Sequence, residues 1–187
     1  MKTAVAMPPP AVWPEMPAMP PPEGFALMRM ELPVKREAKR SYARVGVLAV
    51  LRSWGFPTAT LIETPQGPVT SGADGIAVSL SYAGDSAWIG FAREGRIGLD
   101  ACVIADFPEM KQVARLYLRE QPDLTAGDRA QAFAVAWSRH EAALEQAGIP
   151  LSEDAPPPRS GTRIATLRTG DTVVSVAFDG CAKRRTA

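Results

Sequence analysis

Asp100 and Glu141 are the two acidic residues best placed in the sequence to do chemistry together, and they lie 41 positions apart. Asp100 follows the apolar stretch Ile97 to Leu99, which is typical of a strand, and Glu141 lies in a helical pattern that includes Trp137. The chain between them is long enough for a loop and a helix, so the two carboxylates can meet across a cleft. Because Mg²⁺ binds through a few oxygen ligands plus substrate phosphates, the pair predicts a hard-cation site.

Other reaction chemistries are disfavoured by the residues present. His140 is the only histidine, so a histidine-based metal cluster is excluded, and Leu144 stands where an HExxH zinc motif needs its second histidine. Trp88 stands where a serine-hydrolase elbow needs glycine. Neither a Walker A loop nor a strand-linked GxGxxG is present. Cys102 and Cys181 have no CxxC spacing and no nearby basic partner that would lower a thiol pKa.

The residues before Asp100 predict several strands and one helix. Alternating apolar residues predict a strand from Ala26 to Leu32, and the helical spacing of residues 35–53 predicts a helix that Gly55 and Pro57 end. Residues 58–75 are rich in turn-forming residues. Further strands are predicted at 76–80, 87–92 and 97–103.

The residues after Asp100 predict two helices followed by two strands. The first helix covers 108–119, and the second begins near a capping box formed by Thr125 and Asp128 and ends at Gly148. Phe133, Trp137 and Leu144 mark the buried face of that second helix. A Pro-rich loop at 152–162 leads to strands at 163–167 and 172–178. Helical and strand segments in both halves predict an α+β fold made of two similar halves.

Length and composition predict one domain, or one domain of two similar halves. The chain has 187 residues, of which 46% are hydrophobic, and a net charge of +1. Nothing in this balance calls for nucleic acid or an anionic membrane. Two cysteines and no long apolar N-terminal run favour a reducing cytoplasm over a secreted or membrane-spanning protein. A monomer is expected, because a duplicated chain can form its cleft without a second subunit.

Four segments are expected along the chain. Residues 1–23 hold eight of the 18 prolines and are expected to be flexible, with Trp13 and the methionines able to pack on the domain. Residues 24–104 form the first half and 105–180 the second, and 181–187 form a basic tail.

Three short blocks occur in a distinctive order: Ser79-Leu80-Ser81-Tyr82, Ile97-Gly98-Leu99-Asp100, and Trp137-x-x-His140-Glu141-Ala142. In this order and spacing the chain resembles the 4′-phosphopantetheinyl transferases of the Sfp type, from about Gly24 to Phe178. Members of that family carry a Ser-His pair after a strand, a Gly-x-Asp-x-Glu block and a Trp-x-x-Lys-Glu-Ala block.

The resemblance implies an activity and a set of residue roles. The activity is Mg²⁺-dependent transfer of 4′-phosphopantetheine from coenzyme A (CoA) to a serine of an acyl or peptidyl carrier protein. The fold implied is the pseudo-twofold duplicated α/β fold of these transferases. Asp100 and Glu141 would hold Mg²⁺, and Glu141 would also be the general base. Arg40 and Arg44 are the candidates for phosphate binding, because the planar guanidinium matches phosphate. The further residues expected to contact CoA are Ser81, Tyr82 and His140.

The chain departs from the family pattern at several positions. Tyr82 replaces a histidine, Cys102 replaces a third acidic ligand, and His140 replaces a lysine. Glu145 replaces another lysine, which reverses a charge beside an anionic ligand. Gln66-Gly67-Pro68 stands for Gly-Lys-Pro, and the first half is short.

Purely structural roles remain open for each candidate. Asp100 can cap a turn, Glu141 can be an exposed helix carboxylate, and Trp137 can belong to the core. Arg40 and Arg44 can form a solvated helix face. A structural role is equally open for Ser81, Tyr82 and His140.

Two other functions also remain open. One is a transferase-like protein that binds a carrier protein or CoA without catalysis. The other is a CoA-binding or phosphoester enzyme that reuses the same residues.

Overall fold

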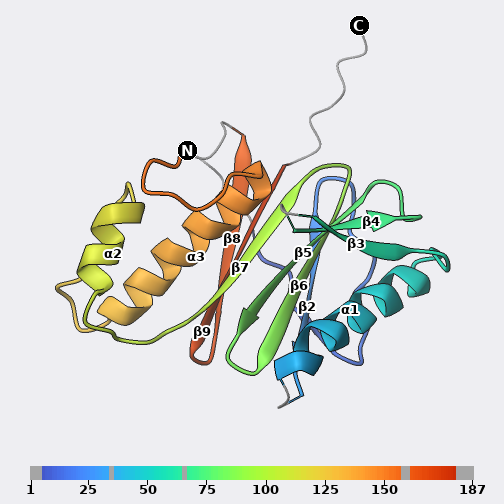
Figure 1. Cartoon of the computed structure of the whole chain (residues 1–187), viewed down its shortest axis with the longest axis horizontal. Coiled ribbons are helices and arrows are strands. Elements are labelled where there is room, and N and C mark those ends of the chain that lie inside the picture. Colours follow the sequence, from blue (N-terminus) through green and yellow to red (C-terminus); the bar gives the residue numbers. More distant parts are fainter. Residues whose placement is uncertain (1–5, 34–35, 65–66, 157–160, 180–187) are drawn as a thin grey trace, which may run out of the picture.

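The computed structural model describes residues 6–33, 36–64, 67–156 and 161–179 (Figure 1). The predicted α+β class is confirmed, because helices and mainly antiparallel sheets occur together. Gln66 and the basic tail expected at 181–187 lie outside the described residues. No helix in the described part of the chain is long and apolar enough to cross a membrane.

The first layer pair combines a four-stranded sheet with the helix α1 (Arg36–Ser53). The strands lie in the order β1-β2-β6-β5, with β1 parallel to β2 and the other pairs antiparallel. The bounds of these strands are β1 Ala11–Val12, β2 Phe25–Glu31, β5 Ile76–Ala83 and β6 Ser86–Arg93. Apolar residues of α1 pack on one face of this sheet, among them Val47 and Leu51, which are fully buried.

The second layer pair combines a three-stranded antiparallel sheet with the helix α3 (Arg129–Ala147). The strands lie in the order β7-β9-β8, with bounds β7 Ile97–Val103, β8 Thr162–Thr169 and β9 Thr172–Asp179. The helix α2 (Met110–Tyr117) lies on the far side of α3 from the sheets (Figure 1). The second sheet packs through Leu99, Val176 and Phe178 on the face of the first sheet that α1 leaves free.

The two halves share a strand–helix–hairpin order once their insertions are set aside, namely a hairpin at residues 60–71 in the first half and α2 in the second. In the first, β2 leads to α1 and then to the β5–β6 hairpin, whose second strand pairs with β2. In the second, β7 leads to α3 and then to the β8–β9 hairpin, whose second strand pairs with β7. Apart from β1, which is added at the edge of the first sheet, each sheet therefore places its last strand between the other two, in the orders β2-β6-β5 and β7-β9-β8.

Three details differ from the sequence predictions. Residues 58–75 are not only turns: β3 (Thr60–Thr64) and β4 (Gly67–Ser71) form an antiparallel hairpin. Proline is tolerated in β4 because a two-stranded sheet leaves each strand with a free edge. The predicted capping box is wrong, because the Thr125 hydroxyl donates to Asp123 and the Asp128 side chain makes no cap hydrogen bond. The strand β7, placed in the first half by the expected boundary at 104, pairs with β9 and so belongs to the second sheet.

The Pro-rich N-terminal segment is packed over residues 6–23. The β1 strand extends the first sheet, and the Trp13 N–H donates to the Arg29 carbonyl at 2.9 Å. The Trp13 ring packs on the core beneath α1, and the indole N–H of Trp54 donates to the Pro17 carbonyl at 2.9 Å. Over residues 6–23 the segment is therefore packed on the domain through β1, Trp13 and Pro17.

Candidate functional site

The β5 strand presents two different faces because side chains alternate along a strand. Ser79 and Ser81 point toward the second half of the molecule, and both make hydrogen bonds with side chains there. Leu80 and Tyr82 point the other way, toward α1, where they line a pocket together with arginines of that helix. One strand therefore takes part in two neighbouring sites.

Asp100 on β7 is fixed by the first of these faces. The Ser81 hydroxyl donates to Asp100 Oδ1 at 3.1 Å, and the Ala101 N–H donates to Ser81 Oγ at 3.0 Å. The second carboxylate oxygen, Asp100 Oδ2, is buried and has no hydrogen-bond partner among the described residues. Burial raises the pKa of Asp100, although its hydrogen bonds with Ser81 and Ala101 oppose this. A buried oxygen without a partner suits a cation, because carboxylate oxygens are the ligands of hard metals.

The helix α3 lies directly against β7 because Gly98 has no side chain. A Cβ at Gly98 would lie 2.1 Å from the Ala142 carbonyl oxygen and 2.3 Å from the Gln146 nitrogen. The contact is between two backbones, so no side chain can move aside. Gly98 therefore sets how close the acidic residues of α3 come to Asp100.

Glu141 on α3 is the residue that meets Asp100 across the cleft. Its pKa is raised to about 7, first by burial and then by the charges of Asp100 and Glu145. Its carboxylate makes no hydrogen bond or ion pair within the described part of the chain. Two carboxylates from distant segments thus share one low-dielectric space, as the sequence analysis expects.

Glu145 lies one helical turn after Glu141 and is fully engaged. The Ser79 hydroxyl donates to Glu145 Oε1 at 2.8 Å, and the Leu99 N–H donates to Glu145 Oε2 at 3.1 Å. Burial raises the pKa of Glu145 to about 7, and the charge of Asp100 acts in the same direction. At neutral pH the carboxyl group is therefore charged only part of the time.

These residues line one cleft of about 520 Å³ between β5, β7 and α3. Its polar part contains Ser81, Asp100, Glu141 and Glu145. Its apolar part is formed by leucines of the three elements and by the segment after α3, namely Leu80, Leu99, Leu144, Ile149, Pro150 and Leu151.

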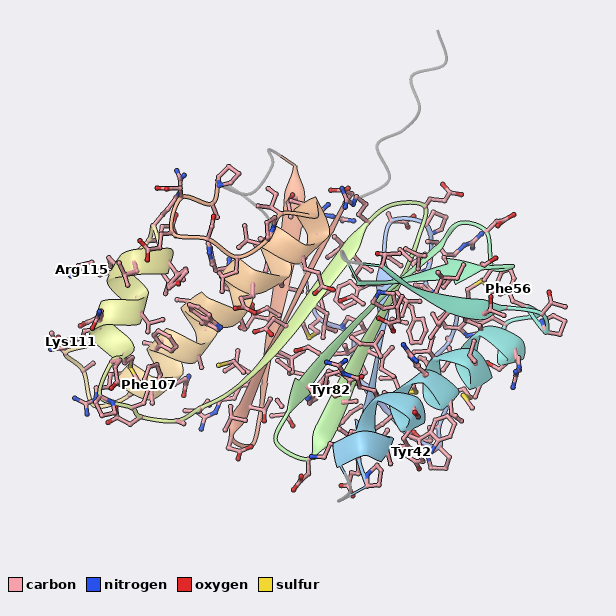
Figure 2. The ribbon with its side chains drawn as sticks, in the orientation of Figure 1. Tyr42, Phe56, Tyr82, Phe107, Lys111 and Arg115 are labelled. Atoms are coloured by element: carbon pink, nitrogen blue, oxygen red, sulfur yellow. The ribbon has the colours of Figure 1, made fainter. Side chains whose placement is uncertain are left out.

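A second, smaller pocket of about 200 Å³ adjoins this cleft and shares Leu80 with it. It is lined by Arg40 and Arg44 of α1 and by Tyr82, which lies at the C-terminal end of β5 (Figure 2). Arg40 is exposed and makes no ion pair with the described residues, whereas Arg44 is paired with Glu63 of β3. Burial raises the pKa of Tyr82, which keeps its phenol a hydrogen-bond donor.

His140 and Cys102 do not line the acidic cleft. The ring of His140 is 6.5 Å from the Trp137 ring, and burial and Arg119 lower the pKa of His140. The sequence-based assignment of His140 to CoA binding therefore receives no support from its position. Cys102 lies beside the cleft, and burial, Asp100 and Glu141 raise its pKa to about 11. The thiol stays neutral and is a poor ligand for a hard cation.

Two features of the cleft are not apparent from the sequence patterns described above. Ser79 was identified only as part of a block, and Glu145 only as a charge reversal, although the two form a direct hydrogen bond. Ser79 and Ser81 are two residues apart in one predicted strand, and this spacing indicates that both side chains lie on the same face. No sequence pattern predicts that residues 149–151 line the cleft, because their position depends on how the chain turns after α3.

No protein-family model matches this chain, and no curated protein matches it.

Proposed function

We propose that the protein transfers the 4′-phosphopantetheine group of CoA to a serine of an acyl or peptidyl carrier protein. The observation that carries the proposal is the convergence of Asp100 and Glu141, from β7 and α3, in one cleft beside a pocket that holds two arginines. The order of the three sequence blocks is that of the Sfp-type transferases, which adds to the same reading.

The donor set fits Mg²⁺. Asp100 Oδ2 is buried without a partner, and the raised pKa of Glu141 reflects a second carboxylate that lacks a compensating charge. Among the described residues no group of three or more His, Cys, Asp and Glu side chains is placed to hold a metal ion. Two carboxylates with substrate phosphates are a common arrangement for Mg²⁺. When bound, Mg²⁺ would supply charge neutralisation for the diphosphate of CoA.

The residues of the chain would divide the remaining work. Arg40 would bind phosphate oxygens, with Arg44 contributing once its pairing with Glu63 is loosened, and the Tyr82 hydroxyl would donate a hydrogen bond there. Glu141, with a pKa near 7, would accept the proton of the carrier serine as its oxygen forms a bond to the phosphorus that carries pantetheine. The bond from that phosphorus to the bridging diphosphate oxygen breaks, and adenosine 3′,5′-bisphosphate leaves with the electron pair.

The equal connectivity of the two sheets supports the proposal that the chain is a duplicated α/β unit of the transferase type. On this reading the two units are the strand–helix–hairpin segments that begin with β2 and with β7. The cleft then lies where the units meet, which suits a monomer.

The proposal is tested by intact-mass spectrometry of apo carrier proteins incubated with this protein, CoA and Mg²⁺. We expect one carrier to gain the mass of a single phosphopantetheine group, and EDTA to prevent the gain. Asp100→Asn should slow the reaction by about 10²-fold or more, while the exposed control Asp154→Asn should react like the unmodified protein. A folded protein that modifies no carrier would refute the proposal.

A second candidate is a transferase-like protein that binds CoA or a carrier protein without turnover. The third carboxylate of the cleft, Glu145, and the pairing of Arg44 with Glu63 favour it, because both reduce the attraction for a polyanionic ligand. Binding of a carrier or of CoA measured by calorimetry, with no mass gain on any carrier, would establish it.

A further inference from the structure

We propose that Glu145 is a positioning residue, which fastens α3 to β5 and β7 and thereby holds Glu141 against Asp100. The inference rests on the proposed function for its catalytic consequence. Its geometric part stands on the contacts of Glu145 alone.

Glu145 ties three elements together. Its carboxylate accepts a hydrogen bond from the Ser79 hydroxyl of β5 at 2.8 Å and another from the backbone N–H of Leu99 on β7 at 3.1 Å. Ser79 itself is fully buried. A bidentate carboxylate held in this way fixes both the rotation of the helix and its position along the sheets.

Glu145 lies close enough to Glu141 on α3 for its hydrogen bonds to affect the position of Glu141. Glu141 precedes Glu145 by four residues, so the two side chains lie on one face, about one turn of 5.4 Å apart. On the other side of Glu141, the Ser138 hydroxyl lies 2.8 Å from the Ser175 hydroxyl of β9. Glu141 therefore lies between two anchored positions, and only the Glu145 anchor reaches the first half of the molecule.

The backbone contact at Gly98 makes the attachment sensitive. The helix lies against β7 with no intervening side chain, and Arg96 Nη1 also donates to the Ala147 carbonyl at 3.2 Å, so loss of the Glu145 anchor should shift the helix slightly and not release it. A displacement of about 1 Å at a catalytic group can lower a rate by about 10²-fold. The negative charge beside a proposed anion site is thus explained by a structural task that a lysine at position 145 could not perform, since lysine has no acceptor oxygen.

Three substitutions separate positioning from other roles. Glu145→Gln keeps an acceptor for the Leu99 N–H and offers a donor to Ser79 Oγ, so it should preserve the attachment. Glu145→Ala and Glu145→Lys remove it. If Glu145 had no role and merely replaced the lysine of the family pattern, Glu145→Lys should increase the affinity for CoA. If the charge of Glu145 mattered in itself, Glu145→Gln should be as damaging as Glu145→Ala.

The first readout is Mn²⁺ binding to the substrate-free protein, followed by electron paramagnetic resonance. We expect Glu145→Ala and Glu145→Lys to weaken Mn²⁺ binding by about tenfold or more, and Glu145→Gln to restore most of the affinity. Near-UV circular dichroism confirms which variants are folded, and the milder Ser79→Ala supplies the same test with an expected intermediate loss. Equal loss in Glu145→Gln and Glu145→Ala, or no loss in either Glu145→Ala or Ser79→Ala, would overturn the proposal.

The second readout is carrier modification. At saturating Mg²⁺, Glu145→Ala should lower kcat with little change in the KM for CoA, and Glu145→Gln should recover kcat. A lower KM for CoA in Glu145→Lys, with kcat kept, would contradict the positioning role. Absence of transfer in the unmodified protein would instead refute the proposed function, and the Mn²⁺ measurements would still decide the role of Glu145.

Discussion

Raising the pH from 5 to 8 is expected to destabilise the metal-free protein, which is the opposite of the usual behaviour of salt-bridged carboxylates. Glu145 has a pKa of about 7 in the folded chain, where an ordinary glutamate has 4.5, and burial is the main cause. The pKa of Glu141 is also raised to about 7, by burial and by the neighbouring charges of Asp100 and Glu145. The folded protein therefore holds protons that the unfolded chain releases at a lower pH.

This difference in bound protons determines whether the free energy of unfolding rises or falls with pH. A carboxyl group with a raised folded pKa contributes its full stability below pH 4.5, and that contribution is lost as the pH rises through 7. For Glu145 the rise from 4.5 to about 7, at about 1.4 kcal/mol per pH unit, corresponds to roughly 3 kcal/mol. Glu141 is more exposed, and solvent screening reduces its share to about 1 kcal/mol. Most of this loss falls between pH 5 and 8.

The assay is urea unfolding followed by circular dichroism at several pH values between 5 and 8, with EDTA present. We expect the free energy of unfolding to fall by roughly 3 kcal/mol over this range, which is a large part of the 5–15 kcal/mol typical of a domain. Glu145→Gln carries no titratable proton at this position, so the fall should shrink to about 1 kcal/mol. The exposed loop residue Glu153 gives the matched control, and Glu153→Gln should behave like the unmodified chain.

Two outcomes would refute the reasoning. Because the lowered pKa of His140 acts in the opposite sense, the first is read in His140→Gln: stability of that variant that stays constant or rises from pH 5 to 8 would mean that the acidic residues of the cleft are not desolvated. An equal fall in the unmodified chain and in Glu145→Gln would place the titrating group elsewhere.

Three further changes test other parts of the structure. Gly98→Ala should lower the free energy of unfolding by about 3 kcal/mol or more, since its Cβ would meet the backbone of α3, whereas Gly127→Ala, which has open space, should change it by less than about 0.5 kcal/mol. Equal effects would show that α3 does not lie on β7 as described. Arg40→Ala should weaken CoA binding in calorimetry by about tenfold, and Arg52→Ala, in the last turn of α1, should leave it unchanged. Equal affinity in Arg40→Ala would remove Arg40 from the site. Trp13→Ala should lower the urea midpoint by an amount equivalent to about 2 kcal/mol, because its ring packs on the first core, and an unchanged midpoint would mean that the N-terminal segment is not held on the domain.

Much of the fold could be predicted because its main elements carry strong periodicity. The strand pattern beginning at Ala26 and the helical pattern of α1 both appear at the expected places. The β3–β4 hairpin was missed because its residues include Pro68 and Gly67, which are typical of turns, and because a two-stranded sheet needs no buried apolar run. Packing of Trp13 on the domain is an expectation that the structure confirms, but the pairing of β1 with β2 could not be predicted, because a Pro-rich composition reports backbone preference and not the sheet edge available to it.

The acidic site could be predicted in part, for a related reason. Asp100 lies in the middle of the largely apolar strand β7 and Glu141 lies in a helix, so local patterns suffice to suggest that they meet. Glu145 could not be interpreted from its charge, because its hydrogen bonds come from Ser79 and Leu99, two strands that only the fold brings beside α3. His140 is adjacent to Glu141 in sequence, but successive helix positions differ by about 100°, which turns it toward Trp137 and out of the cleft.

The acidic cleft and the arginine pocket are built from different elements, so substitutions in one should have little effect on the other. The acidic side is fixed by β7 and α3, through Gly98 and Glu145, and the basic side is carried by α1 and the outward face of β5. Only β5 contributes to both, with Ser79 and Ser81 on one face and Leu80 and Tyr82 on the other. Substitution of Arg40 should therefore lower the affinity for CoA measured in EDTA without altering the Mn²⁺ affinity of the CoA-free protein, and substitution of Glu145 should do the reverse. A double variant of the two is expected to show additive losses, since residues that share no partner couple weakly.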